Sequence, residues 1–573
     1  MSIASAPLPS GRQFAVLWGL ERTFGGMTSA MLRRSRTFAQ STGAPVDILT
    51  FDARDDYDRI VSDLRADGRL DPLLRVRNLW DELTDAPARP GPPAGTKAAA
   101  LDGFAPLPAG GRTSLRRAAD GTLLQLDRRR PDGTLAISDR RDTRVPGELG
   151  GRSIVLCDAA GVPVFGFTRA RPFYHWWLDT VLGDEDAFLV VDSKAAAGAL
   201  LEYRSPRATR IHVLHNSHLD GESRPWAPLK PTRIDVLPRL DDLDAVVVLS
   251  ERQRDDLAVL LGRSDAVHVV PNAAALPTPS PPEPRDPLRG VLLGSLIDRK
   301  RVDDAIRAVA LARESGADVR LDVYGEGPLR PELEALVAEL GVAGPVVLHG
   351  FRPDALDEFR RASFFLLTSR SEGFPLVLTE GMSRGCIPIS YDIPYGPADI
   401  IEDGRSGFLV PPADVPALSD RIAAIARGVP DGMREQAARQ ASAFSDEAVL
   451  ERWRTVLERA RERHLRPVPS FTAEIRDSRF VRRRDSFAVS ADFRLRGVDV
   501  SPDQVSAAVT LRGPDAVVLR AVGGVRRTLR HGIWRAAVQF PQGAAAWLPE
   551  DMPLTRELEL RIQGGLVRLP LHD

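Results

Sequence analysis

Apolar runs alternate with amphipathic segments from the start of the chain. Residues 14–18 have the pattern of a buried strand and are followed by Gly25-Gly26. Apolar residues then recur at helical spacing from Met27 to Phe38, and a second apolar run follows at 46–51. A helical period between two strand-like runs indicates a strand–helix–strand unit. We therefore predict that a doubly wound α/β domain begins here.

A different pattern interrupts this domain at about residues 88–170. Residues 88–111 are rich in Pro, Gly and Ala, which predicts a loop. Short strand-like segments then flank Asp120-Gly121 and Asp132-Gly133, and Asp-Gly in such a setting is a strong signal for a β-hairpin turn. We expect an antiparallel β insertion inside the first α/β domain.

The alternation of strands and helices resumes after the insertion. Apolar runs at 211–215, 245–250 and 267–270 complete a first Rossmann-like domain, assigned to residues 1–275, and the proline-rich stretch 276–288 predicts a hinge. Further strands are predicted at 291–293, 321–324, 346–348, 364–367 and 387–389, with helices near 302–315, 328–340, 375–384 and 414–428.

This second series predicts another Rossmann-like domain at residues 285–445, followed by a crossover helix at 446–465. Two α/β domains joined by a hinge leave a cleft between them, and ligands of such sheets bind at the carboxyl ends of the strands. We therefore expect the functional site at those strand ends.

The last hundred residues have strand periodicity alone. Apolar and polar residues alternate from Phe487 to Leu495 and from Leu558 to Ile562, as in strands with one face in water. Residues 466–573 contain 17 Lys and Arg against 12 Asp and Glu, an excess of five positive charges. We predict a β-sandwich-like module at residues 468–573 that binds an anionic polymer, another subunit or the inner membrane face, or that is a lid that only stabilises the core.

Composition narrows the class of protein. A formal net charge of −1 argues against a general nucleic-acid binder, which needs a clear basic excess. Cys157 and Cys386 have no partners at metal-ligand spacing, so a disulfide framework is not expected and a reducing cytoplasm fits. The start of the chain has no signal-peptide pattern, and no apolar run approaches the roughly 20 residues of a membrane span.

The segment with the clearest chemistry is Ser371-Glu372-Gly373-Phe374-Pro375-Leu376-Val377-Leu378-Thr379-Glu380-Gly381-Met382. A strand ends in a polar turn, and a helix opens with proline in its first turn. Backbone amides around Phe374, Pro375 and Leu376 suit a phosphate or a sugar hydroxyl. Glu372 in the turn and Glu380 in the helix are placed to accept bonds from sugar and ribose hydroxyls. A surface turn with a solvated glutamate is the alternative.

Glu-x7-Glu in this setting resembles the donor site of the large retaining glycosyltransferase family that includes glycogen synthases and mannosyltransferases. Further matches stand in the same order along residues 13–465: Ala245–Ser250, Val269-Val270-Pro271-Asn272, Tyr324-Gly325-Glu326-Gly327-Pro328 and His349-Gly350-Phe351. The stretch Tyr391–Ile401, the β insertion and Gly25-Gly26-Met27-Thr28-Ser29 resemble bacterial α-glycosyltransferases that modify wall teichoic acid or serine-rich adhesins.

The resemblance implies a GT-B fold, in which the first domain faces the acceptor and the second binds the nucleotide-sugar donor. It implies a UDP-linked donor and metal-independent transfer with retention of configuration, without a cofactor. Glu380 would bind ribose, Glu372 the donor sugar and Lys300 the diphosphate, since a lysine between a strand and a helix offers a point charge to phosphate. Without the resemblance, we would interpret Lys300 as a solvated surface lysine.

One position departs from the family. An arginine normally precedes this lysine by five residues, and the present chain has Ser295 there. A serine cannot supply the bidentate cationic contact of an arginine. Arg299 and Arg301 flank Lys300 and are the candidates to replace it. The spacing does not choose between them.

Three other groups of residues have both a functional and a structural interpretation. Gly25 and Gly26 would let a ligand approach the backbone, or would only form a tight turn. His215 resembles the first-domain histidine that faces the sugar, or is a buried core histidine, and His212 and His218 do not complete a metal site with it. The aromatic cluster at 174–177 fits the core or a subunit contact better than an acceptor site.

Asp184-Glu185-Asp186 and Asp242-Leu243-Asp244 have the Asp-x-Asp spacing of metal-dependent glycosyltransferases. The GT-B interpretation needs no such motif, so solvated acidic turns are the preferred interpretation. No metal ligand is therefore assigned.

The leading hypothesis is a retaining glycosyltransferase that moves a sugar from a nucleotide-sugar donor to a cell-surface polymer or glycoprotein acceptor. The alternative is a catalytically weakened GT-B homologue that serves as an acceptor-binding or partner subunit, which Ser295 motivates. Peripheral contact with the inner face of the membrane and a homo-oligomer formed through the β insertion are left open. The sequence does not fix the sugar, the base or the acceptor.

Overall fold

The computed structural model describes residues 7–86, 101, 103–221, 227–277, 283–466, 468–514, 517–530, 532–548, 552–563 and 565–572. Most of the predicted loop at 88–111 and the middle of the predicted hinge, residues 278–282, lie outside the described residues. The chain divides into two compact units, one formed by Pro7–Val213 and one containing Leu214–Asp573. Each unit is described by itself.

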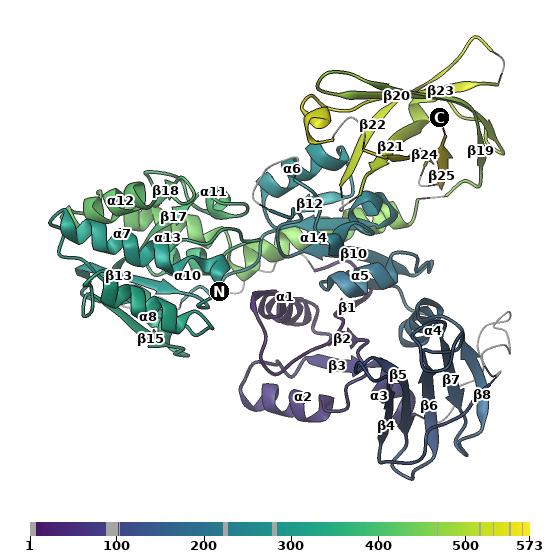
Figure 1. Ribbon diagram of the computed structural model, residues 1–573, viewed down its shortest axis with the longest axis horizontal. Coiled ribbons are helices and arrows are strands. Elements are labelled where there is room, and N and C mark those ends of the chain that lie inside the picture. The colour runs from purple at the N-terminus through teal and green to yellow at the C-terminus, as the bar shows by residue number, and fades with distance from the viewer. Residues whose placement is uncertain are drawn as a thin grey trace. The chain divides into compact units, whose positions relative to one another are not determined.

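The first unit is built on a parallel sheet with the strand order β10-β9-β1-β2-β3 (Figure 1). Strands β1, β2, β9 and β10 are almost wholly buried, as expected of a sheet covered on both faces, whereas the edge strand β3 is partly exposed. Its elements are β1 (Arg12–Val16), α1 (Gly26–Thr42), β2 (Val46–Thr50), α2 (Tyr57–Ala66), β3 (Leu74–Asn78), α3 (Leu79–Asp85), α4 (Ala170–Leu182), β9 (Ala187–Val191), α5 (Lys194–Leu200) and β10 (Ala208–Leu214).

The predicted β insertion is a five-stranded antiparallel meander in which each strand pairs with the next along the chain. The two Asp-Gly turns join strands, as predicted. Gly121 and Gly133 both have a φ of +87°, which favours glycine. The side chains of Asp120 and Asp132 accept hydrogen bonds from the amides of Thr122 and Thr134, both at 2.9 Å. The strands are β4 (Thr113–Arg117), β5 (Leu123–Arg129), β6 (Leu135–Arg140), β7 (Ser153–Cys157) and β8 (Pro163–Phe167).

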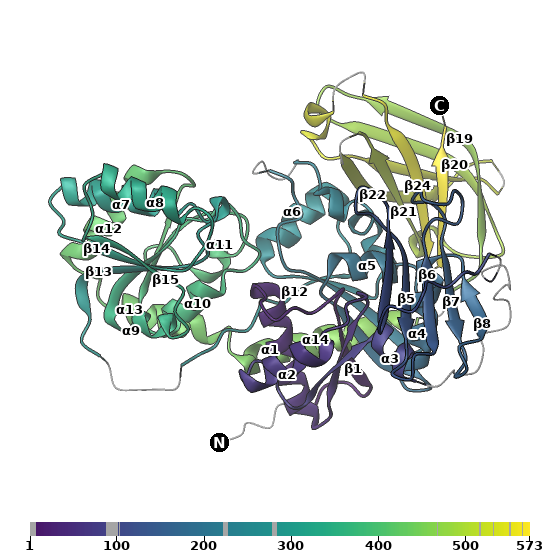
Figure 2. The same ribbon diagram turned by 60° about the horizontal axis from the view of Figure 1, so that its bottom comes forward.

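The second unit contains a six-stranded parallel sheet in the order β15-β14-β13-β16-β17-β18. Helices α7, α8 and α12 cover one face of this sheet, and α9, α10 and α13 cover the other (Figure 2). The elements are β13 (Asp286–Leu293), α7 (Val302–Glu314), β14 (Arg320–Tyr324), α8 (Arg330–Glu339), β15 (Val346–Gly350), α9 (Glu358–Arg361), β16 (Ala362–Leu367), α10 (Leu376–Ser383), β17 (Ile387–Tyr391), α11 (Pro397–Ile400), β18 (Phe408–Val410), α12 (Val415–Arg427) and α13 (Met433–Ser442).

The strand order reverses between β13 and β16, because successive strands leave this pair in opposite directions. Such a switch point separates the loops that follow the two strands and creates a crevice at their carboxyl ends. The same unit also contains β11 (Ala245–Val248), α6 (Glu251–Leu261), β12 (Val267–Val269) and the long helix α14 (Asp446–His464).

The C-terminal residues form one continuous antiparallel sheet in the order β19-β20-β23-β22-β21-β24-β25. The long strand β22 (Val518–Arg527) pairs with β21 (Val505–Arg512) through its first half and with β23 (Trp534–Gln539) through its second half. The edge strands also approach each other, since Ser478 of β19 (Thr472–Arg482) donates to the carbonyl of His572. Instead of a sandwich of two separate sheets, the module is thus a single curled sheet. Its other strands are β20 (Phe487–Arg496), β24 (Thr555–Ile562) and β25 (Gly565–Leu571).

Buried ion pairs fasten this sheet to the segment η3 (Leu237–Asp242). Asp242 contacts Arg568 at 2.7 Å and Arg561 at 3.0 Å, and Asp241 contacts Arg520 at 2.7 Å. The side chain of Asp242 is 0% exposed, so the prediction of a solvated acidic turn at 242–244 is wrong. The sequence could not show this, because the arginines lie some 300 positions further along the chain. Asp184, Glu185 and Asp186 are exposed, as expected of a solvated turn.

Among the described residues, no helix has both the length and the apolar character that crossing a membrane requires. Cys157 and Cys386 are both buried and both free thiols.

Candidate active site

The switch point between β13 and β16 brings two loops together. The loop after β13 contains Ser295 and the short helical turn Asp298–Lys300, and the loop after β16 contains Glu372. Two hydrogen bonds join them: Thr368 Oγ1 donates to the carbonyl of Lys300 at 3.0 Å, and the amide of Arg370 donates to the carbonyl of Arg299 at 2.8 Å. Residues 68 and 71 positions apart therefore face each other.

Glu372 is the centre of this arrangement. Its Oε1 lies 2.6 Å from Lys300 Nζ, and its Oε2 lies 2.9 Å from Arg299 Nη1. Arg299 also donates to the carbonyl of Ser371 at 2.8 Å. The Glu372 side chain is 10% exposed, whereas that of Arg299 is 41% exposed and can be reached from solvent. The carboxylate is thus held between two cations at the mouth of the loop pair.

The charges explain the ionisation of Glu372. Burial alone would raise the pKa of its carboxyl, but the charges of Lys300 and Arg299 outweigh burial and lower the pKa below its ordinary value. Glu372 is therefore an anion at neutral pH, and it accepts hydrogen bonds rather than donating them. Such a carboxylate can orient a cation or accept bonds from hydroxyl groups of a sugar.

Two glycines of the Tyr324–Pro328 segment let another loop close over the end of β13. A Cβ at Gly325 would lie 1.9 Å from the carbonyl oxygen of Gly294, and a Cβ at Gly327 would lie 2.3 Å from that of Leu296. The amide of Leu296 donates to the carbonyl of Glu326 at 2.9 Å. These glycines are packing requirements that shape the loop on which Ser295 and Lys300 are carried.

The segment after β17 forms another wall of the site. The amide of Glu372 donates to the carbonyl of Pro394 at 2.9 Å, and the amide of Tyr395 donates to the carbonyl of Glu372 at 2.8 Å. Gly396 packs against the ring of Pro375, where a Cβ would lie 2.5 Å from Cδ. Residues 391–401 are part of the family resemblance, but the sequence predicted no role for them in the site.

Helix α10 begins at Leu376 after Pro375, as the sequence predicted. The first amides of a helix have no partners within the helix, so this end is suited to an anion or a hydroxyl group. The side chain of Phe374 is buried against Phe444, with ring centroids 5.3 Å apart, and is not available to a ligand. Glu380 lies on the second turn of α10 and is half-buried.

The backbone of His215 reaches the same loop. His215 follows β10 directly and is 6% exposed. A Cβ at Gly373 would lie 1.7 Å from the carbonyl oxygen of His215, so only glycine fits beside it. Near this point, Gln253 donates to the carbonyl of Asn216 at 3.1 Å, and Tyr395 donates from its hydroxyl to Asp256 at 2.8 Å. The sequence identifies His215 and Glu372 as site residues. It does not predict that position 373 must be glycine to leave room for the carbonyl of His215.

The structure separates the two arginines that the sequence left as alternatives. Arg299 contacts Glu372, whereas Arg301 turns back to Asp304, with Nε 3.0 Å from Oδ2. Asp304 also accepts a hydrogen bond from Tyr391 at 2.9 Å, so Arg301 is part of the helix α7 packing. Ser295 is exposed on the same loop as Arg299.

Gly25 and Gly26 lie in the first unit at the start of α1, where Gly25 is the N-cap and Gly26 the first helical residue. Gly25 has a φ of −91°, and a Cβ at either glycine would meet no atom within 4 Å. Neither the backbone angle nor the packing of the described residues therefore requires glycine here. Open space at these positions is what an approaching ligand would need.

The other histidines and the aromatic cluster have structural places. His212 is buried, with Nδ1 2.8 Å from the carbonyl of Val191, and His218 is buried with its ring stacked on that of Tyr395. In the described part of the chain, no three His, Cys, Asp or Glu side chains are grouped so as to hold a metal ion. Tyr174, Trp176 and Trp177 are buried, as expected of core residues.

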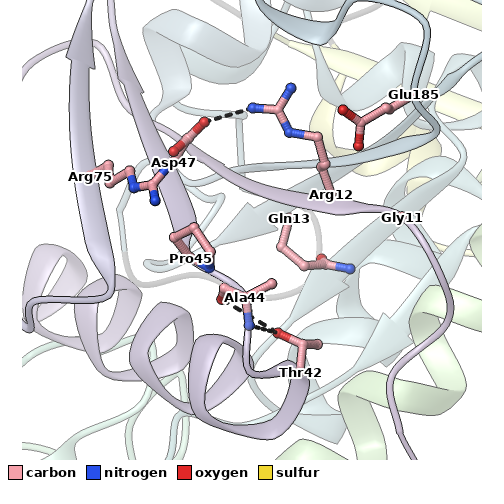
Figure 3. Close-up of a pocket in the computed structure, with 9 residues that line it drawn as sticks. All are labelled: Gly11, Arg12, Gln13, Thr42, Ala44, Pro45, Asp47, Arg75 and Glu185. Carbon is pink, nitrogen blue, oxygen red and sulfur yellow. Dashed lines mark hydrogen bonds and ion pairs between the residues drawn. The ribbon is translucent and has the colours of Figure 1, made fainter.

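A cavity of about 480 Å³ lies elsewhere in the first unit, at the amino ends of β1 and β2 (Figure 3). Arg12 and Asp47 meet across its wall at 2.9 Å, and Gln13 also lines it. Gly25 and Gly26 follow the opposite, carboxyl end of β1. Because ligands of doubly wound sheets bind at the carboxyl ends, this cavity does not belong to the candidate active site.

Residues 279–443, which contain Lys300, Glu372 and Glu380, match the family described as glycosyl transferases group 1. This segment is thus similar to the glycosyl transferases of group 1. It comprises the six-stranded sheet and its helices, so the loops at the switch point are part of it.

Known relatives extend the likeness beyond this segment. A poly(ribitol-phosphate) alpha-N-acetylglucosaminyltransferase of Staphylococcus aureus is 20% identical over 493 residues, which are 77% of this chain and 98% of that protein. An exopolysaccharide phosphotransferase of Streptomyces coelicolor is 32% identical over 350 residues, 58% of this chain and 35% of that one. A poly(glycerol-phosphate) alpha-glucosyltransferase of Bacillus subtilis is 23% identical, and the match covers 42% of its length. The chain thus spans less than half of these last two relatives.

Solved structures establish the fold. The crystal structure of TarM has a TM-score of 0.60 at 18% identity, with 79% of this chain and 100% of that chain covered. The pneumococcal O-GlcNAc transferase GtfA, solved with UDP and GlcNAc, has a TM-score of 0.56 at 18% identity, with 78% and 99% covered. The predicted fold class, GT-B with a β insertion and a C-terminal all-β module, is confirmed.

Proposed function

We propose that this chain is a glycosyltransferase that moves a sugar from a nucleotide-sugar donor to a polymeric or protein acceptor. The observation that supports it most is the placement of Lys300, Arg299 and Glu372 at the switch point of the segment that matches the group 1 family. UDP is the expected nucleotide, because relatives that share the domain are named as UDP-N-acetylglucosamine-dependent transferases or were solved with UDP.

The site residues have distinct chemical tasks in this proposal. When the bond between sugar and diphosphate breaks, negative charge grows on the departing phosphate, and Lys300 and Arg299 are the cations placed to stabilise it. Glu372 holds both cations before the donor binds and accepts hydrogen bonds from the donor sugar once they turn to the phosphate. Glu380 accepts hydrogen bonds from the ribose hydroxyls.

We further propose that transfer retains the anomeric configuration and needs no metal ion. The two cations take the place that a divalent ion has in metal-dependent enzymes. The donor's own diphosphate would accept the acceptor proton on the same face of the sugar, so no protein nucleophile is assigned. Strict dependence on a divalent ion, abolished by a chelator, would contradict this part of the proposal.

The decisive experiment measures UDP release from a panel of UDP-sugars, with wild type, Lys300→Ala and Lys194→Ala. Lys194 is an exposed lysine at the start of α5 and serves as the matched control. Loss of one charge-assisted contact costs about 2–4 kcal/mol of transition-state stabilisation, so Lys300→Ala is expected to be about 30- to 1,000-fold slower. Full activity of this variant would show that the diphosphate lies elsewhere.

Nucleotide binding can be tested separately from transfer by calorimetry with UDP alone. Glu380→Ala is expected to weaken binding of UDP at least tenfold, because it removes the ribose contact. Glu372→Gln is expected to change UDP affinity less than threefold while impairing sugar transfer. Equal losses of UDP affinity in both variants would contradict the division of roles.

A further inference from the structure

The arginines of the C-terminal sheet fall into two groups. Arg520, Arg561 and Arg568 lie in the half that faces η3 and are used in the buried ion pairs with Asp241 and Asp242. The other half, made of β19, β20, β23 and the end of β22, carries its arginines on the surface. These residues do not fasten the module to the rest of the unit.

Four of the surface arginines gather where β22 turns into β23. Arg526 of β22 pairs in register with Arg535 of β23, which in turn pairs with Asp492 of β20. Arg494 lies two residues along from Asp492 on the same face, and its Nε is 4.0 Å from a Cβ built at Gly532 in the turn. Arg530 lies in the turn itself. We call Arg494, Arg526, Arg530 and Arg535 the arginine cluster.

Asp492 lies at the centre of the cluster. Asp492 is bound by Arg535 at 2.5 and 2.7 Å. The hydrogen bond from Arg535, followed by the charges of Arg535, Arg530 and Arg526, lowers the pKa of Asp492. Asp477 and Glu474 of β19 pair in register with Asp492 and Arg494, so the four arginines share three carboxylates and leave an excess of positive charge. Like charges opposite each other on neighbouring strands destabilise a sheet, so this arrangement favours an anionic partner.

The turn also exposes an apolar side chain. Leu529 stands between Thr528 and Arg530 and is wholly exposed to solvent. The turn is held by hydrogen bonds: the Thr528 amide donates to Ile533 at 2.9 Å, and the Arg530 amide donates to the Thr528 hydroxyl at 3.2 Å. These hydrogen bonds hold the backbone on which Leu529 is carried, beside the cluster.

We propose that this turn docks the protein onto an anionic lipid surface. Arginines near such a surface are attracted to phosphate headgroups, while the leucine enters the boundary with the acyl chains. A soluble phosphate polymer would engage the arginines but leave Leu529 in water, so the tip fits a bilayer better. The proposal does not rest on glycosyl transfer.

The test is co-sedimentation of the full chain with vesicles of phosphatidylglycerol and phosphatidylcholine, compared with vesicles of phosphatidylcholine alone. Binding is expected to the anionic vesicles and to weaken as salt is raised. Each arginine near the surface contributes about fivefold, so the double variant Arg526→Gln/Arg530→Gln should bind about 30-fold more weakly. Leu529→Ser should lose roughly tenfold.

The matched control is Arg483→Gln/Arg484→Gln. These two exposed arginines lie in the β19–β20 turn, at the opposite end of the sheet, and their removal changes the net charge equally. The control should bind like wild type. Equal loss in both double variants, or equal binding to neutral vesicles, would overturn the proposal. Tight binding of soluble polyphosphate with no effect of Leu529→Ser would show a polymer site instead and overturn it too.

Discussion

Replacing Asp242 by Asn tests the buried ion pairs that fasten the C-terminal sheet. Asparagine has nearly the same shape but no charge, so it removes the attraction to Arg561 and Arg568 while filling the same space. Both arginines stay largely buried, with side chains 14% and 20% exposed. Arg561 and Arg568 also contact Glu559, at 3.3 and 3.1 Å, so each loses one of its carboxylate partners. Removing one member of a buried ion-pair network is strongly destabilising.

The magnitude follows from the ionisation of Asp242. Burial alone would raise its pKa, but the hydrogen bond and charge of Arg568 and the charge of Arg561 lower it from 3.8 to about 2. A difference of about 1.8 pH units corresponds to about 2.5 kcal/mol. We therefore expect Asp242→Asn to lower the free energy of unfolding of this region by about 2–4 kcal/mol at pH 7, the upper figure allowing for two buried arginines that then share Glu559.

The same reasoning fixes the pH dependence. Because the pKa of Asp242 is lower in the folded than in the unfolded protein, its ionised form stabilises the fold. This stabilisation is complete at pH values well above 3.8 and is lost as the pH falls toward 2. The difference between wild type and Asp242→Asn should therefore be largest above about pH 5 and fall to about half at pH 3. Urea unfolding at pH 7, 5 and 3 measures this difference. Hydrogen exchange at pH 7 should locate the loss in β21–β25.

Asp265→Asn is the control, since Asp265 contacts Arg463 but is 68% exposed. Exposed pairs of this kind contribute less than about 1 kcal/mol. Two results would refute the reasoning: equal effects of the Asp242 and Asp265 variants at pH 7, or a difference from wild type that does not change between pH 7 and pH 3.

Two further predictions concern the candidate active site. Gly373→Ala should slow sugar transfer at least 100-fold, because its Cβ would lie 1.7 Å from the His215 carbonyl oxygen and must displace the loop. The control is Gly198→Ala, which has open space around it and should have no effect on steady-state rates. Arg299→Ala should slow transfer about 30- to 1,000-fold, and adding Ser295→Arg should recover at least tenfold, because the exposed loop returns a cation to the diphosphate. No recovery in the double variant would mean that position 295 does not face the donor.

The sequence by itself determined the architecture because local patterns carry it. Apolar runs and helical periods predicted most strands of both α/β domains but not β3, β9 or β18, and the Asp-Gly turns predicted the meander. The Glu-x7-Glu segment placed Glu372 before a helix and Glu380 within it, because strand, turn and helix are contiguous in the chain. These features depend on residues a few positions apart, so the order of residues in the sequence is enough to predict them.

Only the tertiary structure decided which distant residues meet. Arg299 and not Arg301 contacts Glu372, because β13 and β16 are adjacent at the switch point and the loop turns Arg301 back to Asp304. The sequence predicted a solvated turn at Asp242, but arginines from strands of the C-terminal sheet bury its side chain. Strand order and burial are set by contacts across the whole fold, so no local pattern records them.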